Sequence, residues 1–521
     1  MFSQHLNAIV RTFDARRVPV PRIPAALKAA FAHEARRALS HTLRVPPLSE
    51  RRENPSAYQA LVRERRRDLE ALLLSDAADG GRALDLVCAI CEESRWAAGA
   101  GAVFEDEAHP EIDLQAADTA ALLAWAWLLR SEAFGADAPR VRARMQFEIR
   151  RRILRPLLAC EDYLCTTATL CAAATALLLI EDDREALAVS LRPLLRLLDA
   201  AYACAERARV PLEDRLCDAC AVADLAFLVR KATVGAVDLL REAPFPAWLD
   251  ELLFGHIQDD WFFTCTRGAD RPALSGAALY RLGCLCGDGA LRCLGAALHR
   301  GRAQASPTAT GRLLDASLRE ELDAEFSPAP RLKHAALEDG RLMVARGAGF
   351  FCGVTSGGDR GNVGDLCVFL ERACVLSGGN LPLEQLPRPE SEPLPDWNFS
   401  DETRAIMSVD VTPAYAPEAM VRAHQRTLML SREEYGAQLV DVFDLAAPRA
   451  LRYVFHTPFA PEFFRGGARL GAMRLAWDGA PETDARRLPG DAVFSDGLWE
   501  LTLTYPEAAQ RAMFTFFMRH A

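Results

Sequence analysis

The sequence lacks any hydrophobic run long enough to cross a lipid bilayer. The nearest candidate, Leu170–Ile180, stops at Glu181 and falls short of the roughly 20 apolar residues that a spanning helix needs. The N-terminus also lacks the basic segment, apolar core and small-residue cleavage site of a secretory signal. These absences predict no membrane partner and a cytoplasmic location.

An excess of positive charge is absent as well. The chain has 61 Lys and Arg against 71 Asp and Glu, a formal net charge of -10. Nucleic-acid binders need a concentrated basic face, so no nucleic-acid partner is expected. The basic runs Arg65–Arg67 and Arg150–Arg152 have acidic neighbours close by in sequence, which favours solvated, salt-bridged helix faces.

Metal-binding patterns are weak in this sequence. None of the ten histidines stands in HxH, HxxxH or HxxE spacing. The 15 cysteines are mostly spread singly, as small buried hydrophobes of a cytosolic protein are. The pairs Cys88/Cys91 and Cys217/Cys220 could together bind zinc, but both lie in segments predicted to be helical, whereas zinc knuckles usually place CxxC on tight turns. We therefore assign no metal ligand and no cofactor.

The length of 521 residues predicts about two or three domains, and the composition changes near residue 330. The earlier part is rich in Ala, Leu and Arg with helical periodicity, which is typical of paired antiparallel helices; a solenoid is the alternative. The predicted helices are 57–74, 118–129, 142–158, 166–179, 184–204, 219–240 and 273–298.

After residue 330 the pattern changes to short strands separated by Gly- and Pro-containing turns, which favours a β-sandwich. The sequence therefore predicts an α+β multidomain protein, with a helical domain over 1–328 and an antiparallel β-sandwich over 329–521. The predicted strands are 340–346, 349–355, 365–371, 372–377, 406–411, 427–431, 438–443, 451–456, 473–477 and 499–505.

Four segments resemble, in chain order, those of the bacterial heparinase II/III-like family of polysaccharide lyases. They are Val87–Trp96, Glu111–Ala124, Arg142–Pro156 and Asn362–Leu370. The resemblance implies an incomplete α/α toroid followed by an antiparallel β-sandwich. It also implies a chemistry in which a base removes the C5 proton of a uronic acid and the 4-linked sugar leaves. The family places this chemistry on Tyr and His, with an Asn at the substrate carboxylate and, in some members, zinc in the sandwich.

Several of these family positions carry other residues in this chain. The position of the carboxylate-binding Asn corresponds to Thr167, whose hydroxyl reaches less far than an amide. The stretch Pro211–Val222, which corresponds to that of the catalytic Tyr, contains no Tyr and has Asp218 near the place. Gly358 and Arg360 stand at the catalytic and metal-binding histidines. The resemblance therefore implies a catalytically degenerate member.

Five residues are candidates for binding a substrate. Tyr163 and Trp261 could stack on sugar rings, with Trp261 expected near a helix end, although core packing is the commoner role of such rings. Thr167 is a candidate by its position in the family pattern. Asp359 and Arg360 lie in a Gly-rich turn that could hold an anion, with a plain hairpin loop as the alternative. Tyr163 and Arg360 are also the candidates for catalysis.

Three functions remain open at the level of sequence. The first is a degenerate family member that binds, or once cleaved, a uronate-containing polysaccharide, which makes an acidic polysaccharide or oligosaccharide the expected partner. The second is an active lyase with relocated catalytic residues. The third is a helical scaffold for protein partners. The sequence does not define an oligomeric state.

Overall fold

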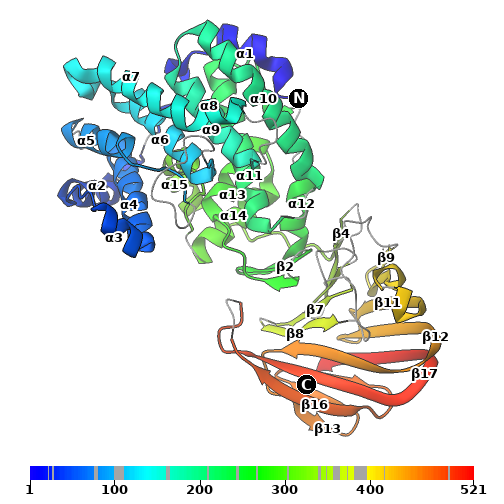
Figure 1. Ribbon diagram of the computed structural model, residues 1–521. Helices are drawn as coiled ribbons and strands as arrows, with labels where there is room; N and C mark the ends of the chain where they lie inside the picture. The colour runs from blue at the N-terminus through cyan, green and yellow to red at the C-terminus, as the bar shows by residue number, and fades with distance from the viewer. Residues whose placement is uncertain are drawn as a thin grey trace. The chain divides into compact units, whose positions relative to one another are not determined.

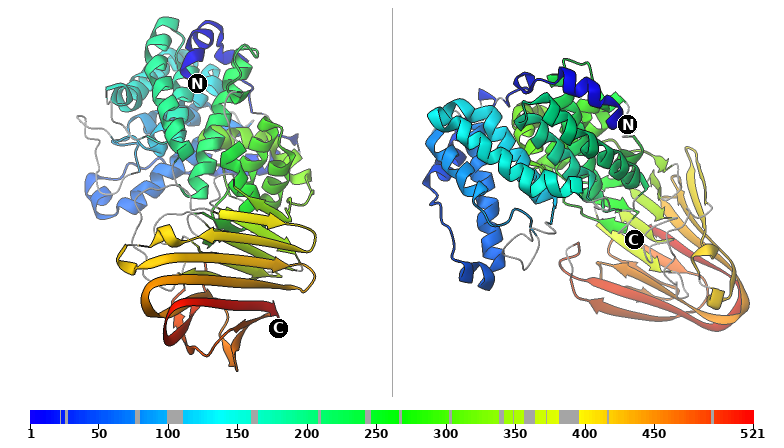
Figure 2. Two further views of the ribbon diagram at one scale, coloured as in Figure 1. Left: turned by 90° about the vertical axis from the view of Figure 1, so that its right-hand side faces the viewer. Right: turned by 45° about the horizontal axis from the view of Figure 1, so that its top comes forward.

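The chain forms two compact units in the computed structural model (Figures 1 and 2). The helical unit comprises Met1–Ala208, Glu213–Phe245 and Leu274–Ala329, and the sheet unit comprises Arg209–Leu212, Pro246–Ala273 and Pro330–Ala521. The structure describes all residues except 22, 26–27, 76–79, 99–110, 160–164, 208–209, 242–245, 266–267, 302–303, 338–341, 348, 356–363, 372, 381–395, 416 and 491–492. Contacts thus group Pro246–Ala273 with the sheet unit, and a domain boundary at residue 328 stays a prediction.

The helical unit contains pairs of antiparallel helices, and most of the predicted helices are confirmed. Helix α9 is buried along its whole length, as expected for a helix that is apolar on every side. The helices are α1 (Leu6–Thr12), α2 (Lys28–Ser40), α3 (Leu48–Glu53), α4 (Pro55–Leu74), α5 (Gly80–Cys91), α6 (Leu114–Arg130), α7 (Ala138–Ile149), a π-helical turn (Arg150–Leu154), α8 (Arg155–Ala159), α9 (Thr167–Ile180), α10 (Arg184–Arg207), α11 (Leu212–Ala232), α13 (Gly276–Cys286), α14 (Gly289–Gly301) and α15 (Ala309–Ala324).

Local sequence explains where several of these helices begin and end. Side chains at the N-cap accept a hydrogen bond from the first turn, as Asp113 does for α6 and Thr308 for α15. The prediction of one helix over 273–298 is wrong, because Gly287 ends α13 in the left-handed conformation with φ 71°. Helix α11 begins and ends earlier than the predicted 219–240.

The sheet unit begins with α12 (Pro246–Gly255) and a three-stranded antiparallel sheet of β1 (His256–Gln258), β2 (Trp261–Thr264) and β3 (Gly268–Asp270). The prediction of a helix end around Trp261 is therefore wrong. Trp, Phe and Thr favour extended backbone, and Asp259 makes the turn between β1 and β2 at a positive φ of 48°.

The large sheet has 14 antiparallel strands in the order β13-β14-β15-β17-β12-β8-β7-β6-β5-β4; β11 also pairs with β12, β10 with β11 and β9, and β16 with β17. Side chains of β5–β8, β10–β12, β14, β15 and β17 share one hydrophobic cluster, as in a sandwich. The bounds are β4 (His334–Ala336), β5 (Leu342–Gly347), β6 (Phe350–Thr355), β7 (Leu366–Leu370), β8 (Ala373–Asn380), β9 (Asp396–Ser400), β10 (Arg404–Asp410), β11 (Val421–Ser431), β12 (Gly436–Thr457), β13 (Glu462–Phe464), β14 (Gly467–Leu470), β15 (Met473–Trp477), β16 (Glu482–Leu488) and β17 (Leu498–His520).

The predicted fold class, helices followed by an antiparallel β-structure, is confirmed. The segments 438–443 and 451–456 belong to one long strand, β12, whose pairing with β17 is irregular between Asp444 and Leu451. Among the helices that the structure describes, none combines the length and the apolar composition that crossing a bilayer requires.

Candidate functional site

Buried polar contacts join the central helices of the helical unit to one another. The Ala168 backbone N–H, at the start of α9, donates to Asp218 on α11 over 2.7 Å. Farther along α11, Asp224 accepts two hydrogen bonds from Arg281 on α13, at 2.9 and 3.1 Å. Arg281 also donates to the Gly311 carbonyl on α15. The helices α9, α11, α13 and α15 are thus connected in series.

Helix α6 contacts the two helices at the ends of this series, α15 and α9. The Trp125 indole N–H donates to the Thr310 hydroxyl on α15 over 3.0 Å. Toward α9, the small residues Ala117, Ala121 and Ala172 form a buried cluster. The five helices therefore form a closed ring of contacts.

The structure brings Thr167 and Asp218 to the same end of this ring. Thr167 is the first residue of α9 and is 1% exposed. Its hydroxyl oxygen has no hydrogen-bond partner among the described residues. Asp218 is buried, which raises the pKa of its carboxyl group to about 6. A carboxyl group that exchanges a proton near neutral pH therefore lies beside an unpaired hydroxyl at a helix N-terminus.

The two CxxC pairs lie on helices, as predicted, with Cys88 and Cys91 on α5 and Cys217 and Cys220 on α11. Burial raises the pKa of Cys91 to about 12, and it raises the pKa values of Cys217 and Cys220 further. A raised pKa disfavours the thiolate form, which is the form that binds metals. No cluster of three or more His, Cys, Asp or Glu side chains suited to a metal occurs within the described ranges.

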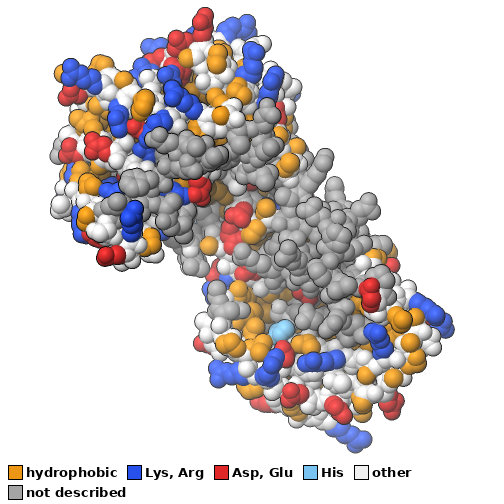
Figure 3. Space-filling model, in the orientation of Figure 1, with side chains coloured by type: hydrophobic (Ala, Val, Ile, Leu, Met, Phe, Trp, Pro, Cys, Tyr) orange, Lys and Arg blue, Asp and Glu red, His pale blue; other side chains and the backbone are white. Residues whose placement is uncertain are grey.

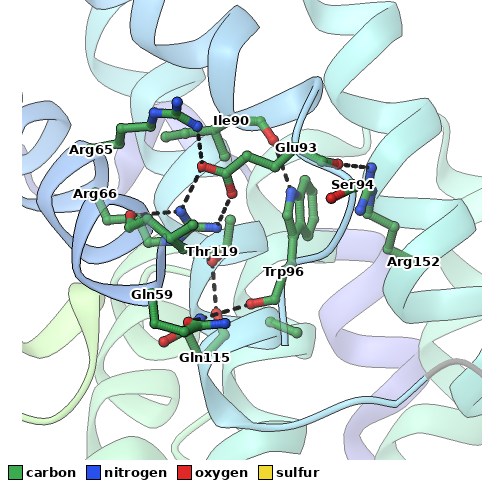
Figure 4. Close-up of polar contacts among 12 residues, drawn as sticks. Gln59, Arg65, Arg66, Ile90, Glu93, Ser94, Trp96, Gln115, Thr119 and Arg152 are labelled. Carbon is green, nitrogen blue, oxygen red and sulfur yellow. Dashed lines mark hydrogen bonds and ion pairs between the residues drawn. The ribbon is translucent and has the colours of Figure 1, made fainter. Parts of the chain in front are cut away.

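Glu93, in the segment after α5, forms a buried ionic cluster with α4 (Figure 4). Its carboxylate accepts from Arg65 over 3.0 Å and from Arg66 over 2.7 Å, and its side chain has no exposed surface. Arg66 also donates to the Thr119 hydroxyl on α6. The prediction of a solvated face for Arg65–Arg67 is therefore wrong for Arg65 and Arg66, because both pair with the buried Glu93 and not with their acidic neighbours in sequence.

Three of the segments that carry the family resemblance meet at this cluster. Arg152, on the π-helical turn, donates to the Glu93 carbonyl over 2.6 Å, and its guanidinium lies 4.9 Å from the Trp96 ring centroid. On α6, the Gln115 amide donates to the Trp96 carbonyl (Figure 4). The contacts between these segments therefore hold helices together, and they involve none of the candidate catalytic residues.

A cavity of about 840 Å³ lies against α4, α6 and α15 in the helical unit. Inside it, Arg312 is held by Glu70 and Asp118, with Nη2 2.6 and 3.1 Å from their oxygens. At its edge, Arg37, Arg63 and Arg67 are exposed and form no ion pair with any described residue. A second hollow of about 540 Å³ shares Arg37 and Arg67 with the first. We call these adjoining hollows the cationic groove.

The cationic groove contrasts with the rest of the chain. On the face shown in Figure 3, acidic and basic side chains are interspersed over both units, and the formal net charge of the chain is -10. Three unpaired arginines along one groove give a local positive potential that the net charge conceals. The carboxylates of Glu34, Glu50 and Glu64 also line the two hollows, so basic and acidic side chains both occur in the groove.

The remaining sequence candidates have mixed outcomes. Tyr163, Asp359 and Arg360 lie outside the described residues. Trp261 is half-buried at the start of β2, where its ring packs against Phe369 and Phe494 with centroid distances of 5.2 and 5.4 Å. Arg271 covers it, with its guanidinium 5.5 Å from the ring centroid. These contacts occupy the ring, and a sugar-binding role for Trp261 stays a prediction.

Comparison with known proteins assigns the fold. The chain has the architecture of polysaccharide lyases that combine a helical toroid with an antiparallel β-structure, so the fold implied by the resemblance to the heparinase II/III-like family is confirmed. The chondroitin AC lyase of Streptomyces coelicolor A3, solved with chondroitin sulphate, matches with a TM-score of 0.57 and 11% identity, over 99% of this chain and 83% of that one. A heparinase III matches with a TM-score of 0.51 and 9% identity, over 100% and 89%.

By sequence alone, no family model and no curated protein matches the chain. At 9–11% identity, the structural likeness shows the fold and assigns no residue its role.

Proposed function

We propose that this protein binds an acidic polysaccharide through the cationic groove of its helical unit and does not cleave it by the family's chemistry. The observation that carries the proposal is the set of unpaired, exposed arginines Arg37, Arg63 and Arg67 along two adjoining hollows. Guanidinium groups form paired hydrogen bonds with carboxylate and sulfate oxygens. Several exposed guanidinium groups in adjoining hollows suit a polymer that presents such anionic groups repeatedly.

Two further considerations support this proposal. The solved structures that share the fold are named for lyases of chondroitin and heparin, which are polyanions. In this chain, the family positions for the carboxylate-binding Asn and for the catalytic Tyr and His carry other residues, on the correspondence drawn from sequence. A cytoplasmic location, and the absence of a nucleic-acid or membrane partner, stay predictions.

The proposal predicts that Arg63→Gln with Arg67→Gln weakens binding of chondroitin sulfate or heparan sulfate. The two arginines lie four residues apart on α4, and loss of both contacts should lower the affinity about tenfold at low salt, equivalent to ~1.4 kcal/mol. Binding is measured by titration calorimetry on the full chain. Binding by the unaltered protein should also weaken as salt rises, because exposed charges are screened.

The matched control is Arg192→Gln with Arg196→Gln on α10, which removes two exposed arginines at the same spacing from the same unit. This control should bind as tightly as the unaltered protein. An equal loss in both double variants would show that only overall charge matters. Absence of saturable binding by the unaltered protein at low salt would reject the proposal.

A second candidate function is β-elimination with Asp218 as the base, favoured by the pKa of about 6 of its carboxyl group. The protonated acid is inactive as a base, so the rate should rise with pH through about 6 and then level off. Asp218→Asn should lower the rate by about 10²–10⁴. The assay follows the ultraviolet absorption of an unsaturated uronate product. Binding without product formation across chondroitin sulfate, heparan sulfate and alginate would leave the first proposal standing alone.

A further inference from the structure

A pocket of about 390 Å³ in the sheet unit collects positive charge independently of the cationic groove. It is lined by residues of β1, β5 and β6 and by the segments before β4 and after β11. Four cations line it, namely Arg331, Lys333, Arg346 and Arg432, against the single carboxylate of Glu371. Of the four, Lys333 forms an exposed ion pair with Glu402.

The three arginines of this pocket form no ion pair within the part of the chain that the structure describes. Arg346 donates only to backbone carbonyls, those of Leu332, Phe254 and His256. Arg432 donates to several carbonyls, including that of Arg346 over 3.1 Å, and to the Ser400 hydroxyl. Neutral oxygens fix the two guanidinium groups in place, and neither group forms an ion pair with a described residue, which is unusual for half-buried charges.

Two buried hydrogen-bond donors of the same pocket lack acceptors. Gln258, at the end of β1, is 8% exposed, and its Nε2 has no partner among the described residues. The Nε of Arg346 is also buried and unpaired. Each buried donor without an acceptor costs about 1–3 kcal/mol, and both residues line this pocket.

The pKa values of His256 and Arg346 are both lowered in this part of the sheet unit. Burial lowers the pKa of His256 to about 4, and Arg346 and Arg331 add to this shift. Burial, followed by Arg331, also lowers the pKa of Arg346 to about 10. Burial and the neighbouring arginines thus both disfavour the protonated forms of these groups.

We infer that this pocket binds an oxyanion, a sulfate, phosphate or carboxylate group, through the Gln258 side chain and the charges of Arg331 and Arg346. Such a group neutralises the guanidinium charge that collects in the pocket. The centroid of the Phe351 ring lies 4.8 Å from the Arg346 guanidinium, and this cation–π contact stabilises the charge. The inference concerns the sheet unit and does not depend on the cationic groove.

The test compares Gln258→Leu and Arg331→Gln with the unaltered full chain. Neither substitution removes a hydrogen bond that holds the backbone, whereas replacing Arg346 or Arg432 would. Thermal unfolding is followed while inorganic sulfate, inorganic phosphate or glucuronate is added, with sodium chloride at equal ionic strength as the blank. A ligand that binds the folded state raises the midpoint in a saturable manner.

We expect one or more of the three anions to stabilise the unaltered protein saturably beyond chloride, and the anion that does so identifies the class of ligand. Its apparent dissociation constant should rise at least about fivefold in Gln258→Leu and in Arg331→Gln. The control Arg465→Gln removes an exposed arginine elsewhere in the sheet unit and should leave the constant unchanged. A response no greater than that to chloride, or equal in all four proteins, overturns the inference.

Discussion

Replacing Glu93 with glutamine is expected to lower the free energy of unfolding of the helical unit by about 3–5 kcal/mol. The Glu93 side chain is fully buried and is the shared partner of Arg65 and Arg66. A neutral amide leaves two buried guanidinium groups without a counter-charge, and one amide oxygen cannot accept all of their hydrogen bonds. The loss should therefore far exceed that of a surface ion pair.

The measurement is urea unfolding followed by far-ultraviolet circular dichroism, which reports mainly on helices. The matched control is Glu50→Gln. Glu50 also pairs with an arginine, Arg44, at 2.6 Å, but its side chain is 38% exposed. The control should change stability by about 0–1 kcal/mol. Equal losses in the two variants would mean that burial of Glu93 contributes nothing beyond an ordinary surface pair.

Replacing Asp441 with asparagine is expected to destabilise the sheet unit by a similar amount, about 3–5 kcal/mol. Asp441 on β12 and Arg426 on β11 both have fully buried side chains, joined by hydrogen bonds of 2.9 and 2.7 Å. Despite burial, Arg426 holds the pKa of the Asp441 carboxyl group far below its usual range. The substitution leaves the buried Arg426 charge without the Asp441 counter-charge.

Hydrogen exchange of peptides from β11 and β12 measures this effect locally. Asp444→Asn is the control, since Asp444 lies on the same strand and pairs with the exposed Arg511; it should change protection little. The double variant Arg426→Met with Asp441→Leu should recover much of the loss, because both charges leave together. A double variant no better than Asp441→Asn would contradict this account.

Much of the fold could be predicted, because the hydrophobic pattern that identifies each helix or strand lies within that element's own sequence. Helix α9 is apolar along its whole length and is buried all round. The hairpin of β5 and β6 follows from two β-rich segments around a Gly-containing turn. The order of helices followed by strands then matched the family resemblance. Strands β1–β3 were missed, since three or four residues are too few to establish a period.

The candidate sites depend on contacts that local patterns do not contain. Arg312 and Glu70 are 242 residues apart in sequence, and nothing near either residue indicates the other. Arg65 and Arg66 have acidic neighbours in sequence, yet they pair with Glu93. Gln258 and Arg346 carry no motif, and only the fold places them on one pocket. Thr167 and Asp218 are the exception, because the family resemblance had already pointed to both positions.

The pairing of β17 with β12 has a consequence for how the protein is made. These strands have 23 and 22 residues and lie side by side in the middle of the sheet, with Arg519 opposite Gly436 and His520 opposite Met473 of β15. During translation, β12 leaves the ribosome well before β17, and one of its edges stays unpaired until β17 has been made. An open edge of that length invites pairing between nascent chains, so a chaperone that shields extended segments should improve the yield of folded protein.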